Sequence, residues 1–227
     1  MKSPYVICHM IPSLDGRIVT SRWQMAKRGY GTYERTQQAL QRDAWIIRRV
    51  SMVPYAGKAR VPVRKDREKM PRTDYVAPHA ASTYAIAIDS CGRLAWKVNH
   101  VDGEHVITVL AEQVSDDYLA FLRARGVSYV FGGKKSIDLP RVLEKLRRLF
   151  GIKRLLLEGG GTINGSFLAA DLIDEMSVVV APIIDGGVGV ASLIDCPPGV
   201  DAVRHLKLIS CEALPGNLVW LRYKVKR

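Results

Sequence analysis

Short apolar runs alternate along the chain with amphipathic stretches. This alternation is typical of parallel strands whose two faces are covered by helices. The run Met176–Ala181 is apolar on both of its faces, as expected of a central strand covered on both sides. We predict strands at Tyr5–Ile11, Ala44–Ile47, Tyr84–Ile88, Val106–Ala111, Ser128–Phe131, Arg154–Leu157 and Met176–Ala181.

Four stretches have the spacing of amphipathic helices. The clearest is Leu139–Phe150, where apolar residues recur at helical spacing and charged residues occupy the other face. Gly151 follows at the position that glycine favours after a helix. We predict helices at Tyr33–Arg42, Asp116–Arg125, Leu139–Phe150 and Thr162–Ala170.

The C-terminal region has a different pattern. Leu206–Ala213 and Leu218–Val225 resemble two strands, and the Pro215-Gly216 pair between them favours a type II turn. The segment Val53–Ala81 has no clear period and is predicted to be a long surface loop. No repeat or linker is visible, so we predict one domain over residues 1–227. Its predicted class is α/β, with a mostly parallel sheet flanked by helices and a C-terminal antiparallel hairpin.

Composition and charge narrow the classes of function. The chain has 227 residues, of which 48% are hydrophobic, and no apolar run reaches the roughly 18 residues of a membrane-spanning helix. The N-terminus lacks a signal-peptide pattern, so we expect a cytoplasmic protein. The four cysteines are scattered, which argues against a zinc finger or a thiol redox pair. The net charge of +12 is compatible with nucleic acid binding or with a site for phosphates.

The strongest local signal is a glycine run that follows a predicted buried strand. Gly159, Gly160 and Gly161 stand before a predicted helix that starts near Thr162. Absent side chains and a helix N-terminus together favour an anion such as a pyrophosphate, although a plain tight turn is the alternative. Glu158 precedes the glycines and is poorly suited to a phosphate, so it is a candidate to bind sugar hydroxyls or simply to face solvent.

Two further segments carry candidate chemistry. Arg48 and Arg49 end a predicted strand and are followed by Ser51, which could cap a short helix. Arginine suits a phosphate monoester such as the 2′-phosphate of NADPH, although a solvated strand end is an equal alternative. The turn Ser13-Leu14-Asp15-Gly16-Arg17 follows the first strand and is a weak signal by itself.

In this order, the three segments resemble the reductase domain of riboflavin biosynthesis, which shares its fold with dihydrofolate reductase and is often fused to a zinc deaminase. The resemblance implies an NADPH-dependent homodimer that reduces the ribose of 5-amino-6-(5-phosphoribosylamino)uracil. It implies Asp15 and Glu158 as catalytic residues, and Ser13, Asp15 and Glu158 as the substrate contacts. It implies a cofactor site formed by Arg49, Ser51, Phe131, Gly132, Gly159, Gly160, Gly161, Thr162, Ile163 and Asn164. The deaminase's zinc signature is absent, so no metal site is expected.

The chain departs from the family's pattern in three places. Arg48 stands where the family usually has glycine, and the family's Asp-x-Pro-x-Leu piece, which helps to hold the ribose phosphate, is missing from Tyr55 onward. Asp89 at a strand end could repel a 2′-phosphate and favour NADH, whereas the two arginines favour NADPH. The alternatives are therefore a reductase of another small heteroaromatic or carbonyl compound and, last, a nucleic-acid-binding protein without catalysis.

Overall fold

The computed structural model describes residues 3–23, 27–56, 63 and 69–226. The chain divides into two compact units, each built from separate stretches of sequence. The first unit comprises Met1–Pro4 and Asp43–Lys153, and the second comprises Tyr5–Arg42 and Arg154–Arg227. Each unit contains both parallel and antiparallel pairs of strands.

In the first unit, three parallel strands form the centre of the sheet. β3 (Tyr84–Ile88) lies between β2 (Ala44–Arg48) and β5 (Glu104–Ala111), and it is parallel to both. On its other side, β5 pairs with parallel β6 (Ser128–Gly133) and with the short antiparallel β4 (His100–Val101). The central strands are almost wholly buried, which explains their continuous apolar runs.

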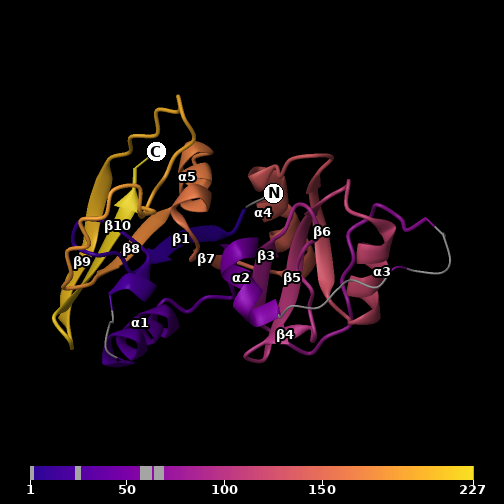
Figure 1. Cartoon of the computed structure of the whole chain (residues 1–227), viewed down its shortest axis with the longest axis horizontal. Helices are drawn as coiled ribbons and strands as arrows, with labels where there is room; N and C mark the ends of the chain where they lie inside the picture. The colour runs from indigo at the N-terminus through magenta and orange to yellow at the C-terminus, as the bar shows by residue number, and fades with distance from the viewer. Residues whose placement is uncertain (1–2, 24–26, 57–62, 64–68, 227) are drawn as a thin grey trace. The chain divides into compact units, whose positions relative to one another are not determined.

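Helices cover the strands of the first unit. α3 (Asp116–Ala124) and α4 (Leu139–Phe150) pack against β6, and α2 (Arg49–Ala56) packs against β2 and β3 (Figure 1). The bounds of α4 follow from local chemistry. The Asp138 side chain accepts a hydrogen bond from the Arg141 backbone N–H, and Gly151 ends the helix in the left-handed conformation.

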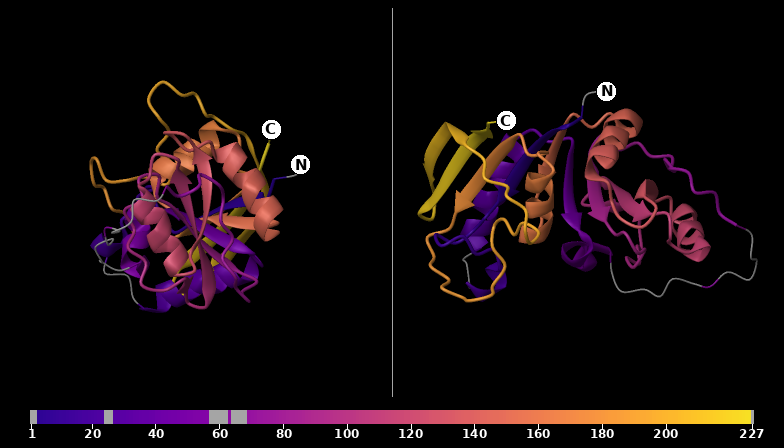
Figure 2. Two further views of the ribbon diagram at one scale, coloured as in Figure 1. Left: turned by 90° about the vertical axis from the view of Figure 1, so that its right-hand side faces the viewer. Right: turned by 90° about the horizontal axis from the view of Figure 1, so that it is seen from above.

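In the second unit, the strand order is β7-β1-β8-β10-β9. β1 (Tyr5–Met10) lies between the parallel strands β7 (Arg154–Leu157) and β8 (Glu175–Val180). β10 (Leu218–Val225) is antiparallel to β8 and to β9 (Leu206–Leu214). Figure 2 shows the β9–β10 hairpin in yellow at the edge of this sheet. Gly216 in its turn has a φ of 88°, as the predicted glycine position requires.

The second unit also contains α1 (Lys27–Ala39), α5 (Gly161–Ala169) and a short 3-10 turn, η1 (Thr20–Arg22). A buried histidine links α1 to the sheet. His9 in β1 contacts Ser177 of β8 through Nδ1 (2.9 Å) and Thr36 of α1 through Nε2 (3.2 Å). Burial lowers the pKa of His9 to about 3, so the ring is neutral at pH 7.

The predicted α/β class, with parallel strands and a C-terminal antiparallel hairpin, is confirmed. All nine predicted strands are present, with their ends within two residues of the predicted ones. Of the four predicted helices, three agree as closely, whereas α1 begins at Lys27 instead of Tyr33. Gly29 and Gly31 are poor helix formers, so the sequence pattern favours a later start for this helix.

Two other predictions need correction. Ser51 does not cap a helix, because α2 already begins at Arg49 and Ser51 lies inside it. The predicted loop Val53–Ala81 starts too early, since its first four residues belong to α2. Part of that loop, 57–62 and 64–68, lies outside the described residues, and the rest contains only an isolated bridge between Tyr75 and Tyr129.

Candidate functional site

The turn that follows β1 is closed by Ser13, which is buried. The Ser13 N–H donates to Arg17 O (2.8 Å), and the Arg17 N–H donates to Ser13 Oγ (2.9 Å). Gly16 has a φ of 82°, a conformation that glycine adopts without steric cost. The turn is therefore rigidly built, and it presents Asp15 at the surface.

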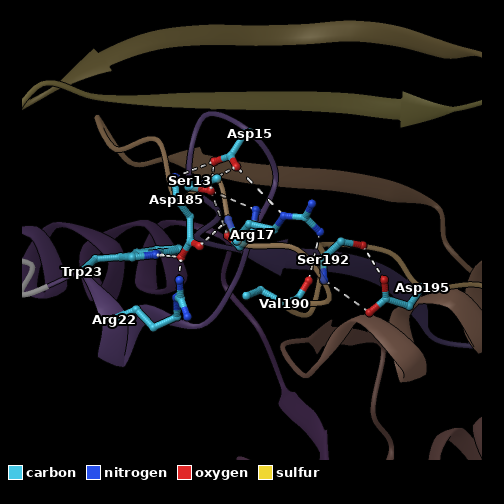
Figure 3. A network of polar contacts seen from close by, with 11 residues as sticks. Ser13, Asp15, Arg17, Arg22, Trp23, Asp185, Val190, Ser192 and Asp195 are labelled. Carbon is cyan, nitrogen blue, oxygen red and sulfur yellow. Dashed lines mark hydrogen bonds and ion pairs between the residues drawn. The ribbon is translucent and has the colours of Figure 1, made fainter.

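The Asp15 carboxylate joins this turn to a second loop, residues 182–196 (Figure 3). It accepts hydrogen bonds from the Ser13 hydroxyl (2.6 Å) and from the backbone N–H groups of Asp185 and Gly186 (2.9 Å each). These bonds, the Ser13 hydroxyl first, hold the pKa of Asp15 well below its usual range. Asp15 is thus ionised at neutral pH, which favours a role in orienting groups over proton donation. Its catalytic role stays a prediction.

Asp185 links the loop 182–196 to the 3-10 turn η1 and to Trp23, which follows it. Its carboxylate accepts hydrogen bonds from the Trp23 indole N–H (2.6 Å) and from Arg22 Nε (3.1 Å). The Trp23 bond is the main cause of the lowered pKa of Asp185. Sequence reasoning assigned no role to these three side chains, because their partners are more than 160 residues apart and no local pattern links them.

Glu158 follows β7 and is half-buried. Its Oε1 accepts a hydrogen bond from Nε2 of Gln37 on α1 (2.7 Å). Burial, and then the nearby charge of Glu158, raises the pKa of the Cys8 thiol to about 12. The carboxylate is therefore held in one place beside the end of β1, where it can accept hydrogen bonds from a ligand as well as from Gln37.

Only part of the glycine run 159–161 has open space where a ligand could approach the backbone. Gly160 has a φ of 72°, and no atom lies within 4 Å of where its Cβ would stand. Gly160 has no side chain that could cap the N-terminus of α5, and the first N–H groups of a helix have no partner within the helix. At Gly161 and Gly165, however, a Cβ would lie less than 3.0 Å from atoms of the segment 192–196. The structural reason for these two glycines is close packing of the chain on itself.

The other residues predicted at this turn differ in exposure. Gly159 and Ile163 are buried, whereas Thr162 is exposed beside Gly160. Asn164 is fully buried, and its Nδ2 donates to Leu193 O (2.9 Å). The Asn164 amide therefore anchors the segment 192–196, and its predicted contact with a cofactor stays a prediction.

In the first unit, a cavity of about 210 Å³ lies at the carboxyl ends of β2 and β3. Three arginines line it: Arg48 at the end of β2, Arg49 at the start of α2, and Arg93 in the segment after β3. Arg93 was missed by sequence reasoning because it is 44 positions from Arg49 along the chain, and only the pairing of β2 with β3 brings them to one cavity. The remaining lining residues are Val50, Ile88, Asp89, Ser90 and Cys91.

Asp89 is a buried acid in the lining of this cavity, and one of its two carboxylate oxygens accepts several hydrogen bonds. Its Oδ2 accepts hydrogen bonds from the backbone N–H groups of Arg93 (2.6 Å) and Leu94 (2.7 Å), and from the Tyr118 hydroxyl (3.1 Å). These three donors are neutral, so they fix the position of the carboxylate without removing its charge, and Asp89 stays an acid in the lining beside the arginines.

Three further predicted residues lie in the first unit outside the lining of that cavity. Ser51 is exposed on α2, Phe131 is 2% exposed, and Gly132 is buried. A Cβ at Gly132 would come within 3.0 Å of Ile137 and Val142, so this glycine serves packing. Their predicted contacts with a cofactor stay predictions.

Among the residues that the structure describes, no group of three or more His, Cys, Asp or Glu side chains is placed to hold a metal ion. Within that same part of the chain, no helix has both the length and the apolar character needed to cross a membrane.

The chain is similar to known reductases along nearly its whole length. A 2,5-diamino-6-ribosylamino-4(3H)-pyrimidinone 5′-phosphate reductase of Methanothermobacter thermautotrophicus is 31% identical over 228 residues, which covers 98% of this chain and 99% of that protein. The riboflavin biosynthesis protein RibD of Actinobacillus pleuropneumoniae is 28% identical, and the match covers 99% of this chain but 57% of that longer protein.

Solved structures show the same fold at low sequence identity. A pyrimidine reductase-like protein of Corynebacterium diphtheriae has a TM-score of 0.71 at 17% identity, with 99% of this chain and 92% of that chain covered. The riboflavin biosynthesis reductase Rib7 of Saccharomyces cerevisiae has a TM-score of 0.61 at 16% identity, with 99% and 90% covered. The family model described as the RibD C-terminal domain matches residues 4–220, and the chain therefore belongs to that family.

Proposed function

We propose that this protein is an NADPH-dependent reductase that acts on a 6-ribosylaminopyrimidine 5′-phosphate in riboflavin biosynthesis. The similarity along its full length to a 2,5-diamino-6-ribosylamino-4(3H)-pyrimidinone 5′-phosphate reductase supports this substrate class. The uracil expected from the family resemblance belongs to the same class and carries an oxo group in place of one ring amino group. Both compounds offer the ribose and its phosphate for recognition.

The observation that carries the cofactor assignment is the cavity lined by Arg48, Arg49 and Arg93. Planar guanidinium groups suit the oxygens of a phosphate monoester, and the adenosine 2′-phosphate is what distinguishes NADPH from NADH. Within the second unit, the open start of α5 at Gly160 supports the predicted binding of a pyrophosphate there. When bound, the nicotinamide supplies the hydride.

The side chains of this chain would orient the substrate. Glu158, held by Gln37, would accept hydrogen bonds from ribose hydroxyls. The turn that carries Ser13 and Asp15 would contact the substrate near the reacting carbon. Such positioning can supply several kcal/mol of barrier lowering.

Replacing Arg93 with Gln tests the cofactor assignment. Because a hydrogen bond between charged groups contributes about 1.5–3 kcal/mol, the KM for NADPH should rise about 10-fold or more. The KM for NADH, which lacks the 2′-phosphate, should change little. Initial rates with each cofactor measure both values.

Arg141→Gln is the matched control, because Arg141 is exposed on α4 and does not line the cavity. Equal use of NADPH and NADH by the unaltered protein would contradict the assignment. The substrate is tested by following NADPH oxidation with the diaminopyrimidinone, the corresponding uracil and dihydrofolate. Activity with dihydrofolate alone would favour a different heteroaromatic substrate.

We also propose that the protein is a homodimer that associates through β9. This edge strand pairs only with β10 among the described strands, and Leu206, Leu208 and Ile209 along it are 43%, 54% and 46% exposed. An exposed apolar edge strand is a surface that proteins normally cover, and pairing with the same strand of a second copy closes a symmetric dimer.

Leu208→Lys should therefore shift the protein toward the monomer, because a charge would be buried in the contact. Sedimentation equilibrium measures the change. Val188→Lys is the control, since Val188 is 99% exposed on the loop 182–196. A monomeric unaltered protein, or an unchanged dimer in the Leu208 variant, would contradict the proposal.

A further inference from the structure

The segment 192–196 is packed against one face of α5. Gly161 and Gly165 are four residues apart on that helix and therefore share a face. A Cβ at either position would overlap Asp195, through its carboxylate at Gly161 and through its backbone at Gly165. The Asp195 N–H also donates to Gly161 O (2.9 Å). The segment thus occupies the space that side chains on α5 would fill.

The Asp195 side chain holds this segment in its folded form. Its Oδ1 accepts a hydrogen bond from the Ser192 hydroxyl (2.5 Å), and its Oδ2 accepts one from the Ser192 N–H (3.3 Å), as Figure 3 shows. The same carboxylate stands beside the first turn of α5, where the helix dipole favours a negative charge. Asp195 therefore ties Ser192 to the beginning of α5.

The other side of the loop is attached to the turn that carries Asp15. Arg17 Nη1 donates to Val190 O (2.9 Å), the Leu193 N–H donates to Gly16 O (2.9 Å), and the Ile18 N–H donates to Ala191 O (3.1 Å). Figure 3 shows the Arg17 side chain reaching toward Val190 and Ser192. One loop thus connects the Ser13–Arg17 turn with the start of α5, all within the second unit.

From these contacts, we infer that Asp195 is a positioning residue for the reaction. It keeps the segment 192–196 seated on Gly161 and Gly165, and so fixes the uncapped N–H groups of α5 relative to the turn that carries Asp15. This inference rests on the proposed function, in which the start of α5 binds the cofactor's pyrophosphate. Donors that are fixed in advance bind a charged group without a cost of reorganisation.

Three variants of the full chain test the inference. Asp195→Ala removes both acceptors for Ser192, so the Kd for NADPH should rise about 10-fold or more, as for the loss of one hydrogen bond to a charged group. Asp195→Asn keeps one oxygen acceptor and should bind NADPH nearly as tightly as the unaltered protein. Asp201→Ala is the control, since Asp201 is exposed and accepts a hydrogen bond from the nearby Val203 N–H.

Fluorescence titration with NADPH gives the affinities. Amide hydrogen exchange at residues 161–163 and 192–196 measures how often the backbone of these two segments opens. Faster exchange at both segments in Asp195→Ala, together with weaker binding, is the expected result. Unchanged NADPH affinity in Asp195→Ala would overturn the inference, even if the variant were less stable to heat. Tighter binding by both Asp195 variants would also overturn it, because charge repulsion would then dominate. If the unaltered protein itself does not bind NADPH, the proposed function fails first and the positioning role fails with it.

Discussion

Replacing Glu158 with Gln is expected to lower kcat/KM for the pyrimidine substrate about 10- to 100-fold, because a hydrogen bond from a hydroxyl to a charged acceptor contributes about 1.5–3 kcal/mol. The amide of the variant can still accept the hydrogen bond from Gln37, so the side chain should keep its place. The Kd for NADPH should change little, since the proposed cofactor contacts are made by arginine side chains and by backbone N–H groups of α5, not by the Glu158 carboxylate. Steady-state rates with the diaminopyrimidinone and with the uracil measure the loss.

Glu212→Gln provides the comparison for this experiment. Glu212 is an exposed acid on β9, and its loss changes the net charge by the same amount. Full turnover in the Glu158 variant would show that this carboxylate makes no important contact with the substrate. A large rise in the Kd for NADPH would instead assign Glu158 to the cofactor.

A methyl group added at Gly165 is expected to have the largest effect on stability. The Cβ of Gly165→Ala would overlap the backbone of Asp195 and Cys196, which cannot move aside as a flexible side chain could. Overpacking of this kind typically costs about 1–3 kcal/mol. Urea denaturation should therefore show a lower midpoint for this variant.

The same substitution at Gly31 should have the opposite sign. Gly31 is also a helical glycine, but no atom of the described residues lies within 4 Å of where its Cβ would stand. Ala at such a site stabilises a protein by about 0.4–1 kcal/mol, because it restricts the unfolded chain. Equal effects of the two substitutions would contradict the packing of segment 192–196 on α5.

Much of the fold could be predicted because its causes are local. The apolar runs of β3, β7 and β8 predict strands by themselves, because a strand that is buried on both faces needs apolar residues throughout. α4 is specified by its stripe of leucines, with an acid before it and a glycine after it. The start of α1 was predicted too late, because Gly29 and Gly31 are poor helix formers and weaken the helical pattern there.

The candidate site was less predictable, because its parts meet only after folding. The glycine run predicted a ligand site at the turn before α5, but the sequence could not distinguish Gly160, which is open, from Gly161, which is packed. Arg93 carries no local motif and reaches the arginine cavity only through the pairing of β2 with β3.

By itself, the sequence determined the α/β class, nearly all of the strands, the helix stripes and the acid and glycines that follow β7, because each depends on residues close together in the chain. Only the tertiary structure decided what those residues contact. In the folded protein, Asp15 accepts hydrogen bonds from backbone N–H groups of the loop 182–196, and Gly161 and Gly165 pack against Asp195. The physical reason is that a side chain's partner depends on distances across the fold, which spacing along the chain does not encode.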